Sequence, residues 1–167
     1  WNSKLMAEMW WGRLRGEDHQ EKASRHGSVG HSNVLAPELR NAARSSEVLF
    51  RLVDKAAARL RRTRYWAGLV TVQIEFVGGG HWDSSLRVAH CQDTLTLLQS
   101  ASTIWDRRPE GTPLKVGVVF NNLRHDRNVA PSLFDSDRRR VALSEAMDQI
   151  NGREDTNGIY FGITHGV

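Results

Sequence analysis

The stretch AGLVTVQIEFVGGGHWDSSLRVAH, residues 67–90, decides the fold. Val70, Val72 and Ile74 alternate with polar Thr71 and Gln73, which is the pattern of a strand with one buried face. Three glycines then predict a turn, and the more polar run HWDSSLRVAH predicts a second strand. We therefore expect a β-hairpin over residues 67–89.

The segments on either side of the hairpin supply two helices and two more strands. Before it, apolar residues recur every three or four positions, which predicts a helix that Ser45 or Ser46 caps. After it, Asp93 is expected to cap a second helix. The runs SVGHSNVL (28–35) and LKVGVVFNNL (114–123) predict the outer strands. The expected buried residues are Val48, Leu49, Leu52, Val53, Ala56, Ala57 and Leu60 in the first helix; Leu95, Leu98, Ala101, Ile104 and Trp105 in the second; and Val116, Val118 and Phe120 in the last strand.

The element order is β-α-β-β-α-β, and each element has one apolar face. The simplest burial is an α+β fold: a four-stranded antiparallel sheet with two helices on one face. The other face of the sheet stays open and is polar and somewhat basic, as a binding module requires. We expect it to present Thr71, Gln73, Ser85, Arg87, Lys115 and Asn121.

The chain changes character after Leu123. Residues 124–137 predict a turn-rich connector, and a C-terminal helical extension follows over 137–150. Ser136 is its expected cap, and Asn151-Gly152 is its expected end. Its apolar face would be Val141, Leu143, Ala146, Met147 and Ile150, and GIYFGITHG (158–166) predicts a short strand.

Composition narrows the class of protein. The chain has 167 residues, 40% hydrophobic and 25% charged, with a single cysteine, Cys91. A lone thiol points to a reducing, cytoplasmic setting, and no apolar run approaches the roughly 20 residues of a membrane helix. The chain opens on Trp1, so we expect a piece of a longer protein.

Positive charge is concentrated in one region. The net charge is +4, and residues 38–64 hold eight Lys and Arg side chains against Glu38, Glu47 and Asp54. Such a region can meet phosphates, and it can equally be a solvated helix face. Both interpretations stay open.

No motif for covalent chemistry emerges. Gly27 and Gly30 stand three apart, but no helix begins where a phosphate loop would need one. The seven histidines form no metal-ligand spacing, and Cys91 has no evident activating base. Asp135 and Asp137 sit where helix capping explains them. We therefore expect a binding module.

The sequence resembles the little finger domain of Y-family lesion-bypass DNA polymerases, the bacterial polymerase IV group. SVGHSNVL resembles the segment that opens that domain, and LRGED (14–18) resembles the linker from the thumb. The hairpin and LKVGVVFNNL resemble the central and last strands. The resemblance covers roughly residues 10–123. It implies the end of the thumb and a linker at 1–25, the little finger at 26–123, and a tail at 124–167.

The resemblance also implies a function. The little finger holds duplex primer-template DNA by its open sheet face, through phosphates and without reading bases. The catalytic palm with its Mg²⁺ is absent from this sequence, so no cofactor and no catalytic residue are expected here. The parent would be a DNA polymerase of translesion synthesis and DNA repair, in the cytoplasm with the nucleoid. The implied DNA-binding residues are Ser28, Gly30, His31, Ser32, Ser85, Arg87 and Lys115. Two positions depart from the family pattern, because Glu75 and Val119 stand where the family commonly has Lys or Arg.

The tail holds a second resemblance. APSLFD (130–135) resembles the sliding-clamp-binding peptide of bacterial polymerases, matched at Ser132, Leu133 and Phe134. A Leu-Phe pair would anchor in an apolar pocket of the clamp. The alternative is that the pair packs onto its own domain.

Other functions share the same element order. An RNA-recognition motif stacks bases on aromatic rings of its first and third strands. Here the third strand has only Trp82, at its edge, and the first has none. A ligand-sensing or interaction domain is a further alternative, by analogy of fold only. An accessory paralogue that has lost its palm carboxylates also fits the sequence.

Overall fold

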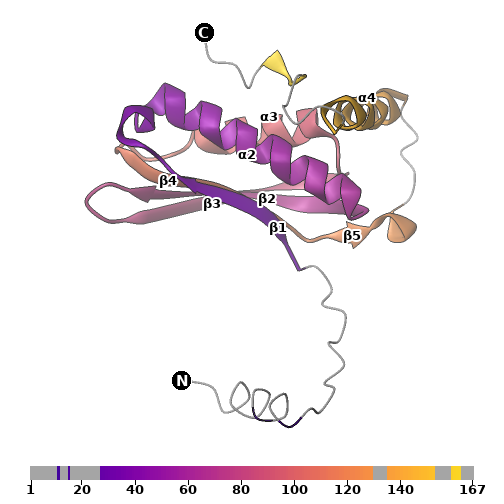
Figure 1. The fold of residues 1–167 in the computed structure, drawn as a ribbon, viewed down its shortest axis with the longest axis horizontal. Coiled ribbons are helices and arrows are strands. Elements are labelled where there is room, and N and C mark those ends of the chain that lie inside the picture. The colour runs from indigo at the N-terminus through magenta and orange to yellow at the C-terminus, as the bar shows by residue number, and fades with distance from the viewer. Residues whose placement is uncertain (1–10, 12–14, 16–26, 130–134, 153–158, 163–167) are drawn as a thin grey trace.

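The computed structural model describes Trp11, Arg15 and residues 27–129, 135–152 and 159–162. Four long strands form an antiparallel sheet in the order β1-β4-β2-β3, with helices above it in Figure 1. This confirms the predicted α+β sheet. The strands are β1 (Val29–Val34), β2 (Tyr65–Phe76), β3 (His81–Cys91) and β4 (Pro113–Asn121).

The predicted hairpin is present and sets the register of the sheet. Thr71 pairs with Ser85, and Glu75 pairs with His81. Gly78, Gly79 and Gly80 all have positive φ, between +88° and +105°. Such backbone is strained for any residue with a Cβ, which explains why three glycines make this turn.

Two helices, α2 (Ala42–Arg62) and α3 (Thr94–Trp105), lie on the same side of the sheet (Figure 1). α2 covers β1 and β4, and α3 covers β2 and β3; a short 3₁₀ turn, η1 (Pro37–Leu39), leads into α2. The cap of α3 is Asp93, as predicted: its carboxylate accepts from Thr96 N at 2.9 Å.

The predicted cap of α2 was wrong. The helix begins earlier, and Asn41 caps it by accepting from Arg44 N at 2.9 Å. Ser45 is buried inside the first turn and donates to the carbonyl of Leu39. Asn is as good a cap as Ser, and the apolar repeat by itself does not locate the first turn.

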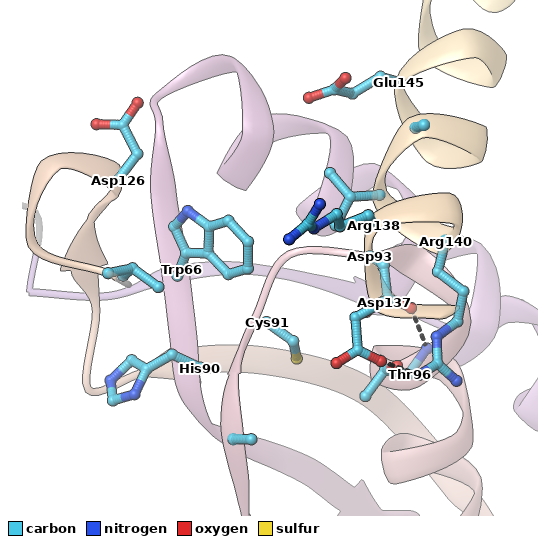
Figure 2. Close-up of a pocket in the computed structure, with 14 residues that line it drawn as sticks. Trp66, His90, Cys91, Asp93, Thr96, Asp126, Asp137, Arg138, Arg140 and Glu145 are labelled. Carbon is cyan, nitrogen blue, oxygen red and sulfur yellow. Dashed lines mark hydrogen bonds and ion pairs between the residues drawn. The ribbon is translucent and has the colours of Figure 1, made fainter. Parts of the chain in front are cut away.

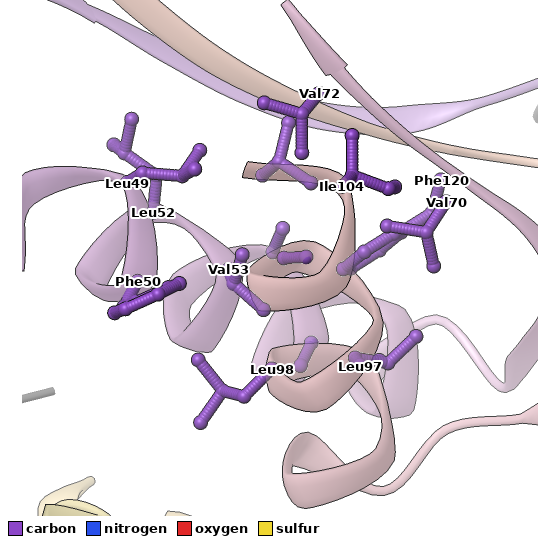
Figure 3. Close-up of a cluster of buried hydrophobic side chains, with 14 of the residues drawn as sticks. Leu49, Phe50, Leu52, Val53, Val70, Val72, Leu97, Leu98, Ile104 and Phe120 are labelled. Carbon is purple, nitrogen blue, oxygen red and sulfur yellow. The ribbon is translucent and has the colours of Figure 1, made fainter. Parts of the chain in front are cut away.

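The core lies between the sheet and these two helices. Val70, Val72 and Phe120 point from β2 and β4 toward α2 and α3, and Figure 3 shows them among the helix leucines. The predicted inward residues Val116, Val118 and Phe120 are all fully buried. In α3, Leu97 is buried and Leu95 is only partly covered, so the predicted apolar face was rotated slightly.

The connector after Leu123 holds regular structure that the sequence did not predict. β5 (Arg124–His125) pairs with Tyr65 and Trp66 at the start of β2, and a 3₁₀ turn, η2 (Asp126–Asn128), follows. The ring of His125 meets Tyr65 edge to face, with centroids 5.3 Å apart. A two-residue strand is too short to show alternation, so only its partner reveals it.

The C-terminal helix, α4 (Asp135–Asn151), is confirmed, but its predicted apolar face was only partly right: Met147 is buried as predicted, and Val141 is partly buried. Ser144 and Met147 are buried, whereas Leu143 and Ile150 are exposed. The helix contacts α2 and α3, and the hydrogen bonds of Ser144 and Asp148 fix its orientation beside buried Met147, whereas its single leucine, Leu143, is exposed. Of the predicted strand at 158–166, the described residues 159–162 form none. None of the described helices is long and apolar enough to cross a membrane.

Buried Arg61 ties α4 to the domain. Its guanidinium donates to both carboxylate oxygens of Asp148, at 2.6 and 2.7 Å, and to Gln92 O and Thr94 Oγ1. Ser144 Oγ accepts from Thr94 N. A two-pronged bond between a guanidinium and a carboxylate is strong and directional. Within the described chain, α4 is thus held as part of the same body as the sheet.

Candidate nucleic-acid interface

The register of the sheet determines which side chains share the open face. Val70, Val72 and Ile74 point into the core, so the residues between them point the other way. Residues paired with them on the neighbouring strands lie on the same face of the sheet. The open face therefore presents Leu69, Thr71, Gln73 and Glu75 of β2; His81, Asp83, Ser85 and Arg87 of β3; Lys115, Gly117, Val119 and Asn121 of β4; and Gly30, Ser32 and Val34 of β1.

Five of the predicted DNA-binding residues come together on this face: Gly30, Ser32, Ser85, Arg87 and Lys115. Ser28 is exposed and lies just before β1. Strand β1 forms one edge of the sheet and β3 the other, so these residues spread across its whole width. Whether they bind DNA stays a prediction.

The centre of the open face is a hydrogen-bonded polar row. Thr71 and Ser85 share a hydrogen bond of 2.8 Å, and Asn121 Nδ2 donates to Thr71 Oγ1 at 3.3 Å. Each hydroxyl keeps further donor or acceptor capacity. The row is therefore a set of polar groups held in place by hydrogen bonds, with Thr71 buried and Ser85 exposed.

The charges of the open face balance. Arg87 and Lys115 are offset by Glu75 and Asp83 on the four long strands. Lys115 Nζ lies 2.8 Å from Glu75 Oε1, and this hydrogen bond lowers the pKa of the Glu75 carboxyl. Arg87 has no ion-pair partner among the described residues. Glu75, the departure noted in the sequence, is thus paired with one of the two cations predicted to hold DNA.

His31 does not join its predicted neighbours. It pairs with Val118, whose side chain is in the core, so the imidazole lies on the helix side of β1. Burial, then the nearby charges of Arg59 and Lys55 on α2, lower its pKa. Only its backbone is shared with the open-face residues, because successive strand residues point to opposite faces.

Packing within the sheet explains why residue 30 is a glycine, without any bound ligand. A Cβ at this position would lie 2.7 Å from the carbonyl oxygen of Val118 and 3.1 Å from Cγ2 of Val119. The neighbouring strand β4 therefore approaches this glycine too closely to leave room for a Cβ. Gly117, opposite Ser32, is similarly crowded.

A cavity of about 530 Å³ lies apart from this face, between the end of β3, η2 and α4. Figure 2 shows Trp66, His90 and Cys91 along its wall, with Arg138 projecting from α4. Burial raises the pKa of the Cys91 thiol to about 12. The thiol is therefore protonated at neutral pH and is a poor nucleophile. No group of His, Cys, Asp and Glu in the described ranges is arranged to hold a metal ion.

The aromatic rings of an RNA-binding sheet are not on the open face. On the described strands β1 to β4, Phe, Tyr and Trp are missing from the open-face positions, and Trp82 packs against the core. β1 and β3 also lie at opposite edges, so no pair of neighbouring strands corresponds to the stacking platform. These observations weigh against the RNA-binding alternative.

Several sequence predictions fall outside the described residues. Ser132, Leu133 and Phe134 are among them, as is most of the expected linker at 1–25. Sequence reasoning also missed two titratable residues of the open face, His81 and Asp83. The alternation of β3 places both there once the turn is known to end at Gly80, so the signal was present in the hairpin.

A family model matches most of the chain. Residues 26–133 match the impB/mucB/samB family C-terminal domain. The comparison with curated proteins found no match.

The comparison with solved structures found polymerases and a polymerase domain. A Y-family DNA polymerase chimera of Dbh and Dpo4 is 12% identical, with 72% of this chain and 36% of that chain covered and a TM-score of 0.52. DinB from Sulfolobus solfataricus is 13% identical, with coverage of 57% and 28% and a TM-score of 0.49. A complex of the β-clamp processivity factor and the little finger domain of PolIV is 17% identical, with coverage of 64% and 97% and a TM-score of 0.48. This chain thus spans about a third of the two polymerase chains.

Proposed function

Because the chain belongs to the impB/mucB/samB C-terminal domain family, the little finger of Y-family DNA polymerases, we propose that it binds duplex primer-template DNA by its open sheet face. The parent would be a translesion DNA polymerase whose palm, outside this sequence, holds Mg²⁺ and performs nucleotidyl transfer. That role would keep the protein in the cytoplasm with the nucleoid.

One observation carries the proposal. Ser32, Ser85, Arg87 and Lys115 come from three strands far apart in the sequence, yet the register turns all four to the same face, which the described helices leave uncovered. The described helices α2 and α3 cover only the opposite face of the sheet (Figure 1). A broad polar surface of this kind suits the backbone of a duplex better than a small ligand, which is normally held in a concave pocket.

The chemistry of the face favours sequence-independent contacts. Hydroxyls and two cations meet phosphate oxygens, which every DNA sequence presents alike. Asn121 and Gln73 are the longer amides that read bases, and Asn121 is already bonded to Thr71. An enzyme that copies damaged templates needs this indifference to sequence.

The test is fluorescence anisotropy of a labelled primer-template duplex with the full 167-residue chain, at several salt concentrations. Weak binding that falls with salt and is equal for unrelated sequences supports the proposal. Binding should weaken in the double variant Arg87→Gln, Lys115→Gln. A single-stranded RNA that binds more tightly than the duplex would refute it.

We also propose the sliding clamp as a partner, on the sequence motif at Ser132, Leu133 and Phe134. Clamp binding should be lost in Leu133→Ala, Phe134→Ala while the melting temperature stays unchanged. If this variant melts earlier, the pair belongs to the domain's own packing, and the clamp proposal fails.

A further inference from the structure

The outer face of α2 carries a row of four basic residues, Arg51, Lys55, Arg59 and Arg62, which we call the α2 row. All four are exposed, and they follow one another at steps of four, four and three. That spacing keeps them on one side of the helix, over a length of about 16 Å. α2 lies on the side of the sheet away from the open face (Figure 1).

The α2 row is not neutralised within the described chain. Its basic neighbours are paired: Arg44 with Glu47, Arg61 with Asp148, and Arg64 with Asp126. The side chains of the four residues of the row have no hydrogen-bond or ion-pair partner in the part of the chain that the structure describes. Among the described residues beside the row, only Asp54 and Glu145 are unpaired acids. Within the described residues the α2 row thus carries four unpaired cations, against one, Arg87, on the open sheet face.

Helix stability does not account for the row. Arg59 and Arg62 near the C-terminus favour the helix dipole, but Arg51 and Lys55 are in its middle. Like charges four residues apart also weaken a helix. The imidazole of His31 lies beside the row, and the charges of Arg59 and Lys55 contribute to lowering its pKa.

Three of the four residues of the α2 row border a hollow. Lys55, Arg59 and Arg62 line a space of about 870 Å³, and the end of α4 forms its other wall. The residues that line it include no Phe, Trp or Tyr. Single-stranded nucleic acid is normally held by stacking its bases on such rings, so this surface does not suit a single strand.

We propose that the α2 row is a second DNA-binding surface, which holds the phosphate backbone of a duplex segment independently of the open sheet face. About 16 Å of B-form duplex presents about five phosphates on each strand, which matches four cations in a line. The sheet separates the two surfaces, so the duplex on the α2 row is a different segment from the one on the open face. Charge complementarity and the missing stacking rings select duplex DNA as the occupant.

The test compares three variants of the full chain by duplex binding against salt. The α2 variant is Arg51→Gln, Lys55→Gln, Arg59→Gln, Arg62→Gln. A control with the same net charge is Arg107→Gln, Arg124→Gln, Arg127→Gln, Arg139→Gln, and the sheet variant is Arg87→Gln, Lys115→Gln. Each cation removed from a phosphate lowers the slope of log K against log salt by about 0.9, so the α2 variant, which loses four, should show a slope smaller by about 3.6 and an affinity about tenfold or more weaker. The charge-matched control should change far less.

The outcomes separate this inference from the proposed function. If the α2 variant binds like the charge-matched control, the inference is overturned, whatever the sheet variant does. If only the sheet variant keeps full affinity, the inference stands and the proposed function of the sheet fails. Two additive losses of affinity support both.

Two further measurements identify the occupant. Duplex bound to the α2 row should raise the pKa of His31, followed by NMR, in the wild type and in the sheet variant, because phosphates offset the nearby cations. No shift would count against the inference. Single-stranded DNA or polyglutamate that competes on the α2 row as well as duplex would overturn duplex DNA as its occupant.

Discussion

The open sheet face and the α2 row differ in how their charges are arranged. On the sheet, Lys115 is paired with Glu75, and cations and anions balance. On α2, four cations stand without partners in the described chain. Hydrogen bonds to neighbouring side chains hold the polar groups of the sheet in place, which suits a surface that positions bound DNA. The α2 row offers long-range attraction, which suits capture and rises as salt falls.

Truncating a core side chain that lies beneath both surfaces should destabilise the fold on which both surfaces depend. Phe120 is fully buried between the sheet and the helices. Phe120→Ala should lower the free energy of unfolding by about 4 kcal/mol, because apolar burial is removed and a cavity is left behind. Chemical denaturation measures it. Leu143→Ala, at an exposed apolar position of α4, is the control and should change little. Equal decreases in the two variants would place the core elsewhere.

Releasing α4 should affect the α2 side and spare the sheet. Asp148→Ala leaves two donors of buried Arg61 without acceptors and should cost about 3 kcal/mol. Asp148 lines the hollow beside the α2 row, so that hollow should lose the wall that α4 forms. The register of the sheet should persist, because Asp148 does not contribute to it. Amide chemical shifts of β2 and β3 test this. Glu145→Ala, on the same helix and exposed, should leave stability unchanged.

Crowding at Gly30 distinguishes a structural glycine from a binding one. Gly30→Ala forces a Cβ against the Val118 carbonyl and should cost about 2 kcal/mol. Gly27→Ala meets nothing within 4 Å and should be neutral. Thermal melting compares them. An unchanged melting temperature in Gly30→Ala, with weaker DNA binding, would instead assign this glycine to the phosphate.

Unpairing Lys115 should make the sheet more like the α2 row. Glu75→Gln frees the ammonium and adds one net positive charge, so duplex affinity should rise about fivefold at low salt, with a steeper salt dependence. Asp83→Asn adds the same charge without freeing Lys115 and should give a smaller gain. Anisotropy titrations decide; equal gains would mean that net charge matters and the ion pair does not.

The sequence alone predicted the elements with strong periodicity. The alternation of Val70, Val72 and Ile74, the glycine turn and the apolar repeat of α2 each depend on residues close in the chain, so local pattern is enough to recognise them. The inward residues of β4 and the cap Asp93 followed in the same way. Five DNA-binding candidates also share one face, because alternation is a local rule that the register preserves.

Tertiary structure decided what depends on residues far apart. β5 exists only through its pairing with Tyr65 and Trp66, and α4 is oriented by Arg61, 87 positions before Asp148. The same long-range geometry placed His31 on the helix side and paired Lys115 with Glu75, 40 positions away. The sequence by itself thus determined the four long strands, the three long helices and the buried faces of β2, β4 and α2, since these follow from local periodicity. Which charges are paired and which remain free to bind DNA follows only from packing, because distance in space and not in sequence decides an ion pair.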